Sequence, residues 1–183
     1  GCSMADMANL AKVERCWREL AEVLGEAPDT RFTPVTYINS AADLKAFCGE
    51  HGGIVCTSSN APTILDWSFA QRPGVLFFPD QHLGRWTAHQ KGIALEDMQI
   101  WDPDQKYGGL TPEQIRSAKM LLWKGHCAVH QMFQPAHIKR WREKHPEGCV
   151  ISHPESPFEV CRLSDHVGST EHIIKTIKDA PSG

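Results

Sequence analysis

The sequence lacks a surplus of basic residues and lacks long apolar runs. Lysine and arginine together number 19, against 22 aspartates and glutamates, and the formal net charge is -3. Nucleic-acid-binding surfaces are typically basic, so we expect no nucleic-acid partner. No stretch approaches the roughly 20 apolar residues of a membrane-spanning helix, so we also expect no membrane association. The N-terminal residues have neither the charged start nor the apolar centre of a signal peptide.

The sequence also lacks the paired-cysteine motif Cys-X-X-Cys. Its seven cysteines are an odd number and are scattered without the spacing of a small disulfide scaffold. A closed four-thiolate zinc or iron site built from local motifs is therefore unsupported. Reduced thiols are typical of the cytoplasm, and a cytoplasmic location is predicted. We expect Cys16, Cys48, Cys56, Cys149 and Cys161 to be buried, small apolar side chains.

What the sequence does contain is a regular alternation of short apolar runs and helical segments. This alternation predicts an α/β fold of three-layer α/β/α units, in which helices cover both faces of short parallel sheets. Ligands of such sheets bind at the carboxyl ends of the strands. The predicted strands are 35–38, 54–56, 74–78, 120–123, 149–152 and 166–167, and the predicted helices are 4–24, 41–47, 61–70, 135–144, 157–163 and 170–178.

Residues 92–109 interrupt this alternation, since they are polar and rich in turn-forming residues. We interpret them as a surface insertion. A helix then restarts at Thr111, which is a typical N-cap. Pro112 takes the first helical position and Gln114 completes a capping box.

Two stretches of the sequence share one order of elements. Residues 35–60 read as strand, polar triplet, helix, strand and hydroxyl pair, and residues 151–171 read the same way. The two copies have low residue identity, so the repeat rests on order and chemistry. Two similar units facing each other would place both polar triplets and both hydroxyl pairs around one cleft.

Four chemically active side chains follow two of the predicted strands. Cys127 and His130 come after strand 120–123, and His153 and Glu155 come after strand 149–152. Thiol, imidazole and carboxylate together are suited either to a metal centre or to acid–base chemistry. Pro154 fixes the backbone between His153 and Glu155, which favours an acid–base couple at one rigid strand end.

Two hydroxyl pairs lie where a predicted strand turns into a helix, at Ser58-Ser59 and at Ser169-Thr170. Free amides and hydroxyls at such a turn can bind phosphate or carboxylate. Plain helix capping favours the same residue types, so capping remains an open alternative. In the first copy of the repeat, Tyr37 and Asn39 occupy the place of the polar triplet and could orient a substrate. The segment 80–85 is also polar and follows a strand, but alone it is a weak signal.

These motifs, in this order, resemble the quinolinate synthase family. The resemblance extends over nearly the whole chain. It is carried by the segments 1–3, 37–39, 57–61, 79–85, 125–130, 153–155 and 168–170.

The resemblance implies three similar α/β/α units around a pseudo-threefold axis, of which about two are present. It implies a 4Fe-4S cluster held by three cysteines, with Cys2 and Cys127 matching the first two. Iminoaspartate and dihydroxyacetone phosphate would be the substrates, and the aspartate-oxidising enzyme that supplies iminoaspartate could be a transient partner. The positions that match substrate-contacting or catalytic residues of the family are Tyr37, Ile38, Asn39, Ser58, His130, His153, Pro154, Glu155, Ser169 and Thr170.

The resemblance also implies a division of the chain. Residues 1–30 would end the first unit, 31–125 would form the second with an insertion at about 92–109, and 126–183 would form part of the third. The family usually has cysteine where this sequence has Ser156, and no cysteine follows Thr170 to serve as the third cluster ligand. We therefore expect these residues alone to be inactive.

Two further hypotheses remain open at this point. A mononuclear zinc or iron hydrolase could use Cys127, His130, His153 and Glu155. A non-catalytic module could instead bind phosphorylated metabolites through Ser58 and Thr170, in which case binding would survive mutation of every cysteine.

Overall fold

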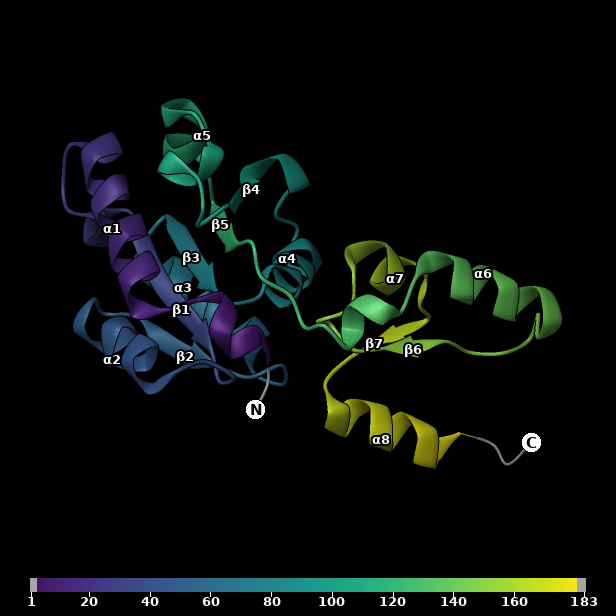
Figure 1. The fold of residues 1–183 in the computed structure, drawn as a ribbon. Helices are drawn as coiled ribbons and strands as arrows, with labels where there is room; N and C mark the ends of the chain where they lie inside the picture. Colours follow the sequence, from purple (N-terminus) through teal and green to yellow (C-terminus); the bar gives the residue numbers. More distant parts are fainter. Residues whose placement is uncertain (1–2, 181–183) are drawn as a thin grey trace.

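The computed structural model describes residues 3–180, which form two parallel sheets with helices packed around them (Figure 1). The larger sheet belongs to the part of the chain that ends near residue 125, and the smaller sheet belongs to the part that follows. The α/β class predicted from the sequence is confirmed. No helix of the described residues is both long enough and apolar enough to cross a membrane.

The larger sheet has five strands, and all of its neighbouring strands are parallel. Its spatial order is β2-β1-β3-β5-β4. The central strands are buried on both faces, as expected for a parallel sheet covered by helices. The strands are β1 (Phe32–Tyr37), β2 (Ile54–Cys56), β3 (Gly74–Phe78), β4 (Met98–Trp101) and β5 (Met120–Trp123).

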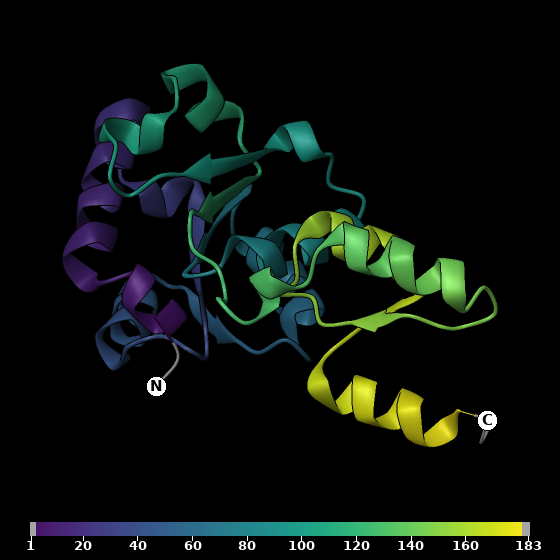
Figure 2. The same ribbon diagram turned by 45° about the vertical axis from the view of Figure 1, so that its right-hand side comes forward.

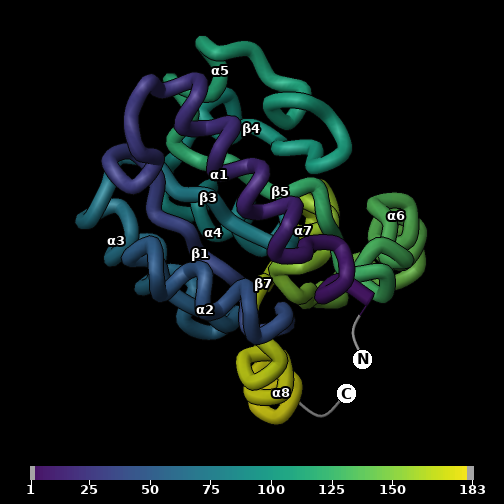
Figure 3. The backbone as a smooth tube through the Cα atoms, turned by 60° about the vertical axis from the view of Figure 1, so that its left-hand side comes forward, coloured from purple at the N-terminus to yellow at the C-terminus, as the bar shows by residue number. Residues whose placement is uncertain are grey.

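Helices cover the two faces of this sheet in two groups. The helices α1 (Leu10–Leu24), α2 (Ala42–Glu50) and α5 (Pro112–Ser117) pack on one face, which carries Leu76, Phe78 and Trp123. The helices α3 (Ala61–Gln71) and α4 (Gln81–Gln90) pack on the other face, with Val75, Phe77 and Leu122. Figure 3 shows α1 running across its face of the sheet. The alternation of side chains along β3 and β5 therefore supplies both apolar layers of an α/β/α sandwich.

The smaller sheet has two parallel strands, β6 (Ile151–Ser152) and β7 (His166–Val167). The helices α6 (Pro135–Lys144) and α7 (Phe158–Leu163) lie on one side of it, and α8 (Thr170–Asp179) lies on the other (Figure 2). The order β1-α2-β2-α3 thus recurs as β6-α7-β7-α8, with the strand pair parallel in both copies. This agrees with the repeat predicted from the sequence.

The helix α4 lies between the two parts of the chain. On the sheet side it buries Leu83 and Ala88. On the other side it contacts α7, where the Phe158 ring lies 6.0 Å from the Trp86 ring and 5.0 Å from the His89 ring, measured between centroids. Aromatic contacts of this kind fix the position of one element against another.

Three sequence-based predictions need correction. Residues 92–109 are not simply a surface insertion, because Met98–Trp101 form β4, the edge strand that pairs with β5. The helix predicted over 4–24 begins only at Leu10, since the Asn9 side chain accepts a hydrogen bond from the Lys12 amide and caps the helix there. Cys149 is exposed rather than buried.

Gly125 offers a test of how closely the segment after β5 packs against the segment after β3. A Cβ atom at this position would lie 1.9 Å from the backbone oxygen of Pro79. Because a backbone atom cannot move aside cheaply, Gly125→Ala should lower the free energy of unfolding by about 1–3 kcal/mol. Gly49→Ala is the matched control, since nothing lies within 4 Å of that Cβ, and it should be neutral or slightly stabilising. Chemical denaturation measures both. Equal stability of the two variants would contradict this packing.

Candidate functional site

The site forms at the carboxyl edge of the larger sheet. Tyr37 ends β1, Asp80 follows β3, and Cys127 follows β5, and these three parallel strands are neighbours. Parallel strands end at the same edge, so the sheet gathers residues that are far apart in the sequence. The smaller sheet contributes His153 and Glu155, which follow β6.

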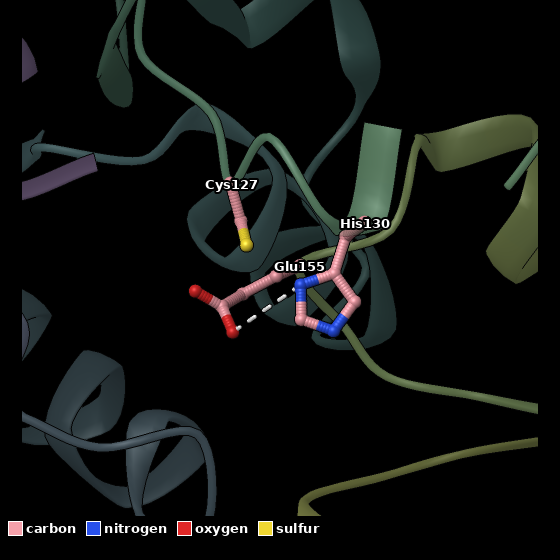
Figure 4. Close-up of side chains that lie close together, drawn as sticks. All are labelled: Cys127, His130 and Glu155. Atoms are coloured by element: carbon pink, nitrogen blue, oxygen red, sulfur yellow. Dashed lines mark ion pairs between the residues drawn. The ribbon is translucent and has the colours of Figure 1, made fainter. Parts of the chain in front are cut away.

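Cys127, His130 and Glu155 form the centre of this site. One possible ligand atom from each residue lies within 4.8 Å of the other two (Figure 4). The Cys127 and Glu155 side chains are buried, and the His130 side chain is partly exposed. The strand-end reasoning correctly predicted that these three residues meet, and their donor atoms suit either a metal or proton transfer.

The side chains of His153 and Glu155 lie in contact beside Cys127. The Glu155 Oε2 lies 3.2 Å from the His153 Nδ1, and this nitrogen accepts a 3.3 Å hydrogen bond from the Glu155 backbone amide. Burial and then the nearby Asp80 raise the pKa of Glu155 to about 7, while burial and then His130 lower the pKa of His153 to about 4. Both shifts favour the neutral forms. The Glu155 carboxyl therefore keeps its proton up to about neutral pH, and the His153 imidazole beside it is neutral there.

The His130 ring stacks on the His153 ring, with 4.8 Å between centroids and 14° between planes. Burial lowers the pKa of His130, so this imidazole is also neutral. Its Nδ1 lies 3.7 Å from the Glu155 Oε2, which is beyond hydrogen-bond length. Among the described residues this buried nitrogen has no hydrogen-bond partner. A buried polar atom without a hydrogen-bond partner favours a position that binds a ligand or water.

Tyr37 and Asp80 complete the buried base of the site. Burial and then the Glu155 carboxyl raise the pKa of Tyr37, while a hydrogen bond with the Ser58 side chain lowers it. The Asp80 side chain is fully buried and caps α4, accepting hydrogen bonds from the amides of His82 at 3.2 Å and Leu83 at 2.7 Å. Because its pKa is raised, Tyr37 stays protonated and can act as a hydrogen-bond donor.

A cavity of about 210 Å³ lies between the two parts of the chain and brings Ser58 and Ser59 together with Ser169, but Thr170 does not line it. Ser58 and Ser59 line it from the amino end of α3, and Ser169 lines it from the amino end of α8. The Ser169 hydroxyl caps α8 through the His172 amide, at 3.4 Å. Ser58 makes no such cap, so capping accounts for Ser169 but not for Ser58. Two helix amino ends facing one cavity favour an anionic ligand.

Some predicted residues lie away from the buried centre. Ile38 is 43% exposed, and Asn39 and Thr170 are also exposed. Pro154 is buried and lines the cavity that holds Ser58 and Ser169. Cys2 lies outside the described residues.

Asp80 and His82 are the site neighbours to which sequence reasoning gave least weight. The sequence offered one signal, a polar segment directly after an apolar strand. That signal marks the correct edge of the sheet, but it does not reveal which side chains turn inward.

Comparison with known proteins identifies the family. A family model described as quinolinate synthetase A protein matches residues 1–183. The chain belongs to the quinolinate synthase family. Proteins named quinolinate synthase from Herpetosiphon aurantiacus, Rhodopirellula baltica and Bacillus subtilis are 58%, 56% and 49% identical to it. Each comparison covers 100% of this chain but only 49%, 46% and 48% of the relative, so the chain spans about half the length of these relatives.

The family resemblance implies a 4Fe-4S cluster, and the described residues fit one part of it. Iron–sulfur clusters are held by cysteine thiolates. Cys127 brings a thiol with 8% exposure to the centre of the site, next to the unpartnered Nδ1 of His130. Cys127 therefore fits as one ligand. Membership of the quinolinate synthase family favours this reading over the mononuclear hydrolase, which would use the same side chains.

The burial of Asp80 makes the stability of the protein depend on pH, and this dependence can be measured. Burial raises the pKa of Asp80 from 3.8 to about 7. Between these values the folded protein keeps a proton that the unfolded chain has lost, so stability falls as pH rises through this window. Asp80→Asn keeps an acceptor oxygen for one of the two amides and removes the titration. The stability of the wild type relative to this variant should therefore fall by roughly 2–4 kcal/mol between pH 4 and pH 8.

Asp165→Asn is the control for that experiment, because the stability contribution of Asp165 changes with pH in the opposite direction. Hydrogen bonding to the Val150 amide holds the pKa of Asp165 below its usual range. The contribution of Asp165 is then present above its unfolded pKa and lost at lower pH, so the wild type should gain relative stability as pH rises. Urea denaturation across the pH range measures both differences. A pH-independent difference for Asp80→Asn would contradict its burial as an acid.

Proposed function

We propose that the complete protein to which these residues belong is a quinolinate synthase that condenses iminoaspartate with dihydroxyacetone phosphate. The products would be quinolinate, phosphate and two waters. The observation that carries this proposal is the Cys127, His130 and Glu155 group in a chain of the quinolinate synthase family. Because the chain spans about half of its relatives, the activity is proposed for the complete protein. We expect the 183 residues alone to be inactive.

The buried couple of His153 and Glu155 suits the proton transfers that this condensation needs. Carbon–carbon bond formation requires a proton to leave the carbon of iminoaspartate, and each water that departs requires a proton at its oxygen. A carboxyl with a pKa of about 7 beside a neutral imidazole can give and accept protons near neutral pH. We assign these transfers to His153 and Glu155, with His130 as a third group facing the substrate.

The hydroxyl-lined cavity suits the phosphate and carboxylate groups of the two substrates. Ser58 and Ser169 line it, and the amino ends of α3 and α8 add partial positive charge. Tyr37 would orient the substrate through its protonated hydroxyl, since its pKa is raised. Ile38, Asn39, Pro154 and Thr170 are assigned as further contacts, from their match to the family alone.

Cys127, together with Cys2, would hold a 4Fe-4S cluster beside these groups. When bound, the cluster would supply a Lewis acid for a substrate oxygen during dehydration. The residues around it would orient the substrate, exclude water and carry the protons. Burial of Cys127 and Glu155 supports such a role, because electrostatic interactions are stronger away from water.

The wider biological setting follows from the same proposal. The ranges 1–30, 31–125 and 126–183 would belong to three consecutive units around a pseudo-threefold axis. The six cysteines among the described residues are all free, which agrees with a reducing, cytoplasmic setting. An aspartate-oxidising enzyme would deliver iminoaspartate and could associate transiently.

Replacement of Cys127 tests the cluster. In the complete enzyme, purified without oxygen, Cys127→Ser should lose most of the bound iron and sulfide and the broad visible absorption, together with quinolinate formation. A serine oxygen is a poorer ligand for iron in such clusters than a thiolate. Cys149→Ser is the matched control, since Cys149 is exposed, and it should keep all three properties. Stoichiometric zinc without sulfide in the wild type would contradict the proposal.

Replacement of Ser58 tests the anion site. Ser58→Ala removes one hydroxyl from the cavity and should raise the KM for dihydroxyacetone phosphate by about 10- to 100-fold, as expected for one hydrogen bond to a charged group. Ser117→Ala, on the exposed surface of α5, is the control and should leave the KM unchanged. Steady-state kinetics measures both. An unchanged KM in Ser58→Ala would remove the cavity from the proposed site.

A further inference from the structure

The loop that carries Cys127 and His130 lies against the first turn of α4. Gln131 directly follows His130, and its Nε2 lies 2.7 Å from the Nε2 of His82. These two residues are 49 positions apart in the sequence, so the contact depends on the packing of the two parts of the chain.

The chemistry of the two side chains sets the direction of this hydrogen bond. The side-chain nitrogen of Gln131 can only donate, so the Nε2 of His82 must accept and carry no proton. Burial, followed by the charges of Arg85, His126 and His130, lowers the pKa of His82 to about 4, so the ring is neutral. A neutral imidazole with an unprotonated Nε2 carries its proton on Nδ1, an atom that is buried without a hydrogen-bond partner among the described residues.

His82 is itself held rigidly. The Asp80 side chain accepts hydrogen bonds from the backbone amides of His82 and Leu83, which fixes the first turn of α4. Leu83 is fully buried against the larger sheet. The backbone of His82 is therefore held in a fixed position at the first turn of α4.

The loop, in contrast, makes few hydrogen bonds to the rest of the molecule, although the Cys127 side chain packs in the core cluster on the α3–α4 face of the larger sheet. Between Cys127 and Phe133 the backbone hydrogen bonds are internal, running from residues 131, 132 and 133 to residues 127, 129 and 130. Val129 is 62% exposed and Met132 is 71% exposed. Among residues 3–180, the His82–Gln131 contact is the one hydrogen bond that joins 127–133 to the larger sheet and its helices.

We propose that His82 is a positioning residue, whose Nδ1–H tautomer accepts from Gln131 and so holds Cys127 and His130 opposite Glu155. The part that concerns catalysis rests on the proposed function. The part that concerns the position of the loop does not, because it follows from contacts within the described residues.

The first experiment measures the loop without any activity. In the complete, metal-free protein, the rate at which iodoacetamide alkylates Cys127 is followed by mass spectrometry. His82→Leu and Gln131→Leu should each raise this rate about fivefold, since the lost hydrogen bond is worth about 1 kcal/mol. The double variant should be no faster than either single one. His82→Gln, which can place an acceptor oxygen at the position of Nε2, should restore the slow rate. Met132→Ala is the control and should leave it unchanged.

The second experiment reads the tautomer directly. Nitrogen NMR of the histidine-labelled protein near neutral pH should show an unprotonated Nε2 and a protonated Nδ1 for His82, and Gln131→Leu should shift both signals. A Nε2–H tautomer, a charged ring, or an unchanged alkylation rate in His82→Leu would each overturn the proposal.

Steady-state kinetics of the complete enzyme with its cluster bound tests whether the position of the loop affects catalysis. His82→Leu should lower kcat by about 10- to 100-fold with little change in KM, because a displaced catalytic group affects the reaction more than binding. If the wild type forms no quinolinate while the alkylation and NMR results hold, the proposed function fails and the positioning contact stands. If kcat is unchanged although the loop loosens, His82 does not position the catalytic groups.

Discussion

The site depends on one constraint, the common carboxyl edge of three neighbouring parallel strands. β1, β3 and β5 end there, so Tyr37, Asp80 and Cys127 meet although they are far apart in the sequence. The buried side chains of Val75, Phe77 and Leu122 pack in one apolar cluster and hold these strands in place. Helices cover both faces of the sheet, so the strand ends form its open edge. The smaller sheet then needs only to present His153 and Glu155 toward this edge for the site to close.

Burial determines the charge state of the site. It raises the pKa values of Asp80 and Glu155 to about 7 and lowers those of His82 and His153 to about 4, so acids and bases lie side by side in their neutral forms. Neutral groups are cheaper to bury than charged ones, and the two acids, with pKa values of about 7, can exchange a proton near neutral pH. Packing of the fold and readiness for proton transfer therefore have one physical cause, which is exclusion of water from the strand ends.

Much of this organisation can be predicted from the sequence, because the signals are local. The apolar run 74–78 is bounded by turn residues, and the capping box at Thr111 forms as predicted. β4 escaped prediction since an edge strand has one strand neighbour and tolerates polar residues such as Gln99. Strand ends predicted the Cys127, His130 and Glu155 group. The His82–Gln131 contact had no local signal, because it arises only when α4 packs between the two parts of the chain.

We propose that Cys127 binds iron beside a substrate-holding group formed by His130, His153 and Glu155. The most direct measurement is a crystal structure of the complete protein, prepared without oxygen, with anomalous scattering recorded at the iron edge. The account predicts a multi-iron peak bonded to the Cys127 Sγ, with His130 and Glu155 beside it but not bonded to iron. A single metal ion bonded to Cys127, His130 and Glu155 together, or no iron at Cys127, would contradict the account.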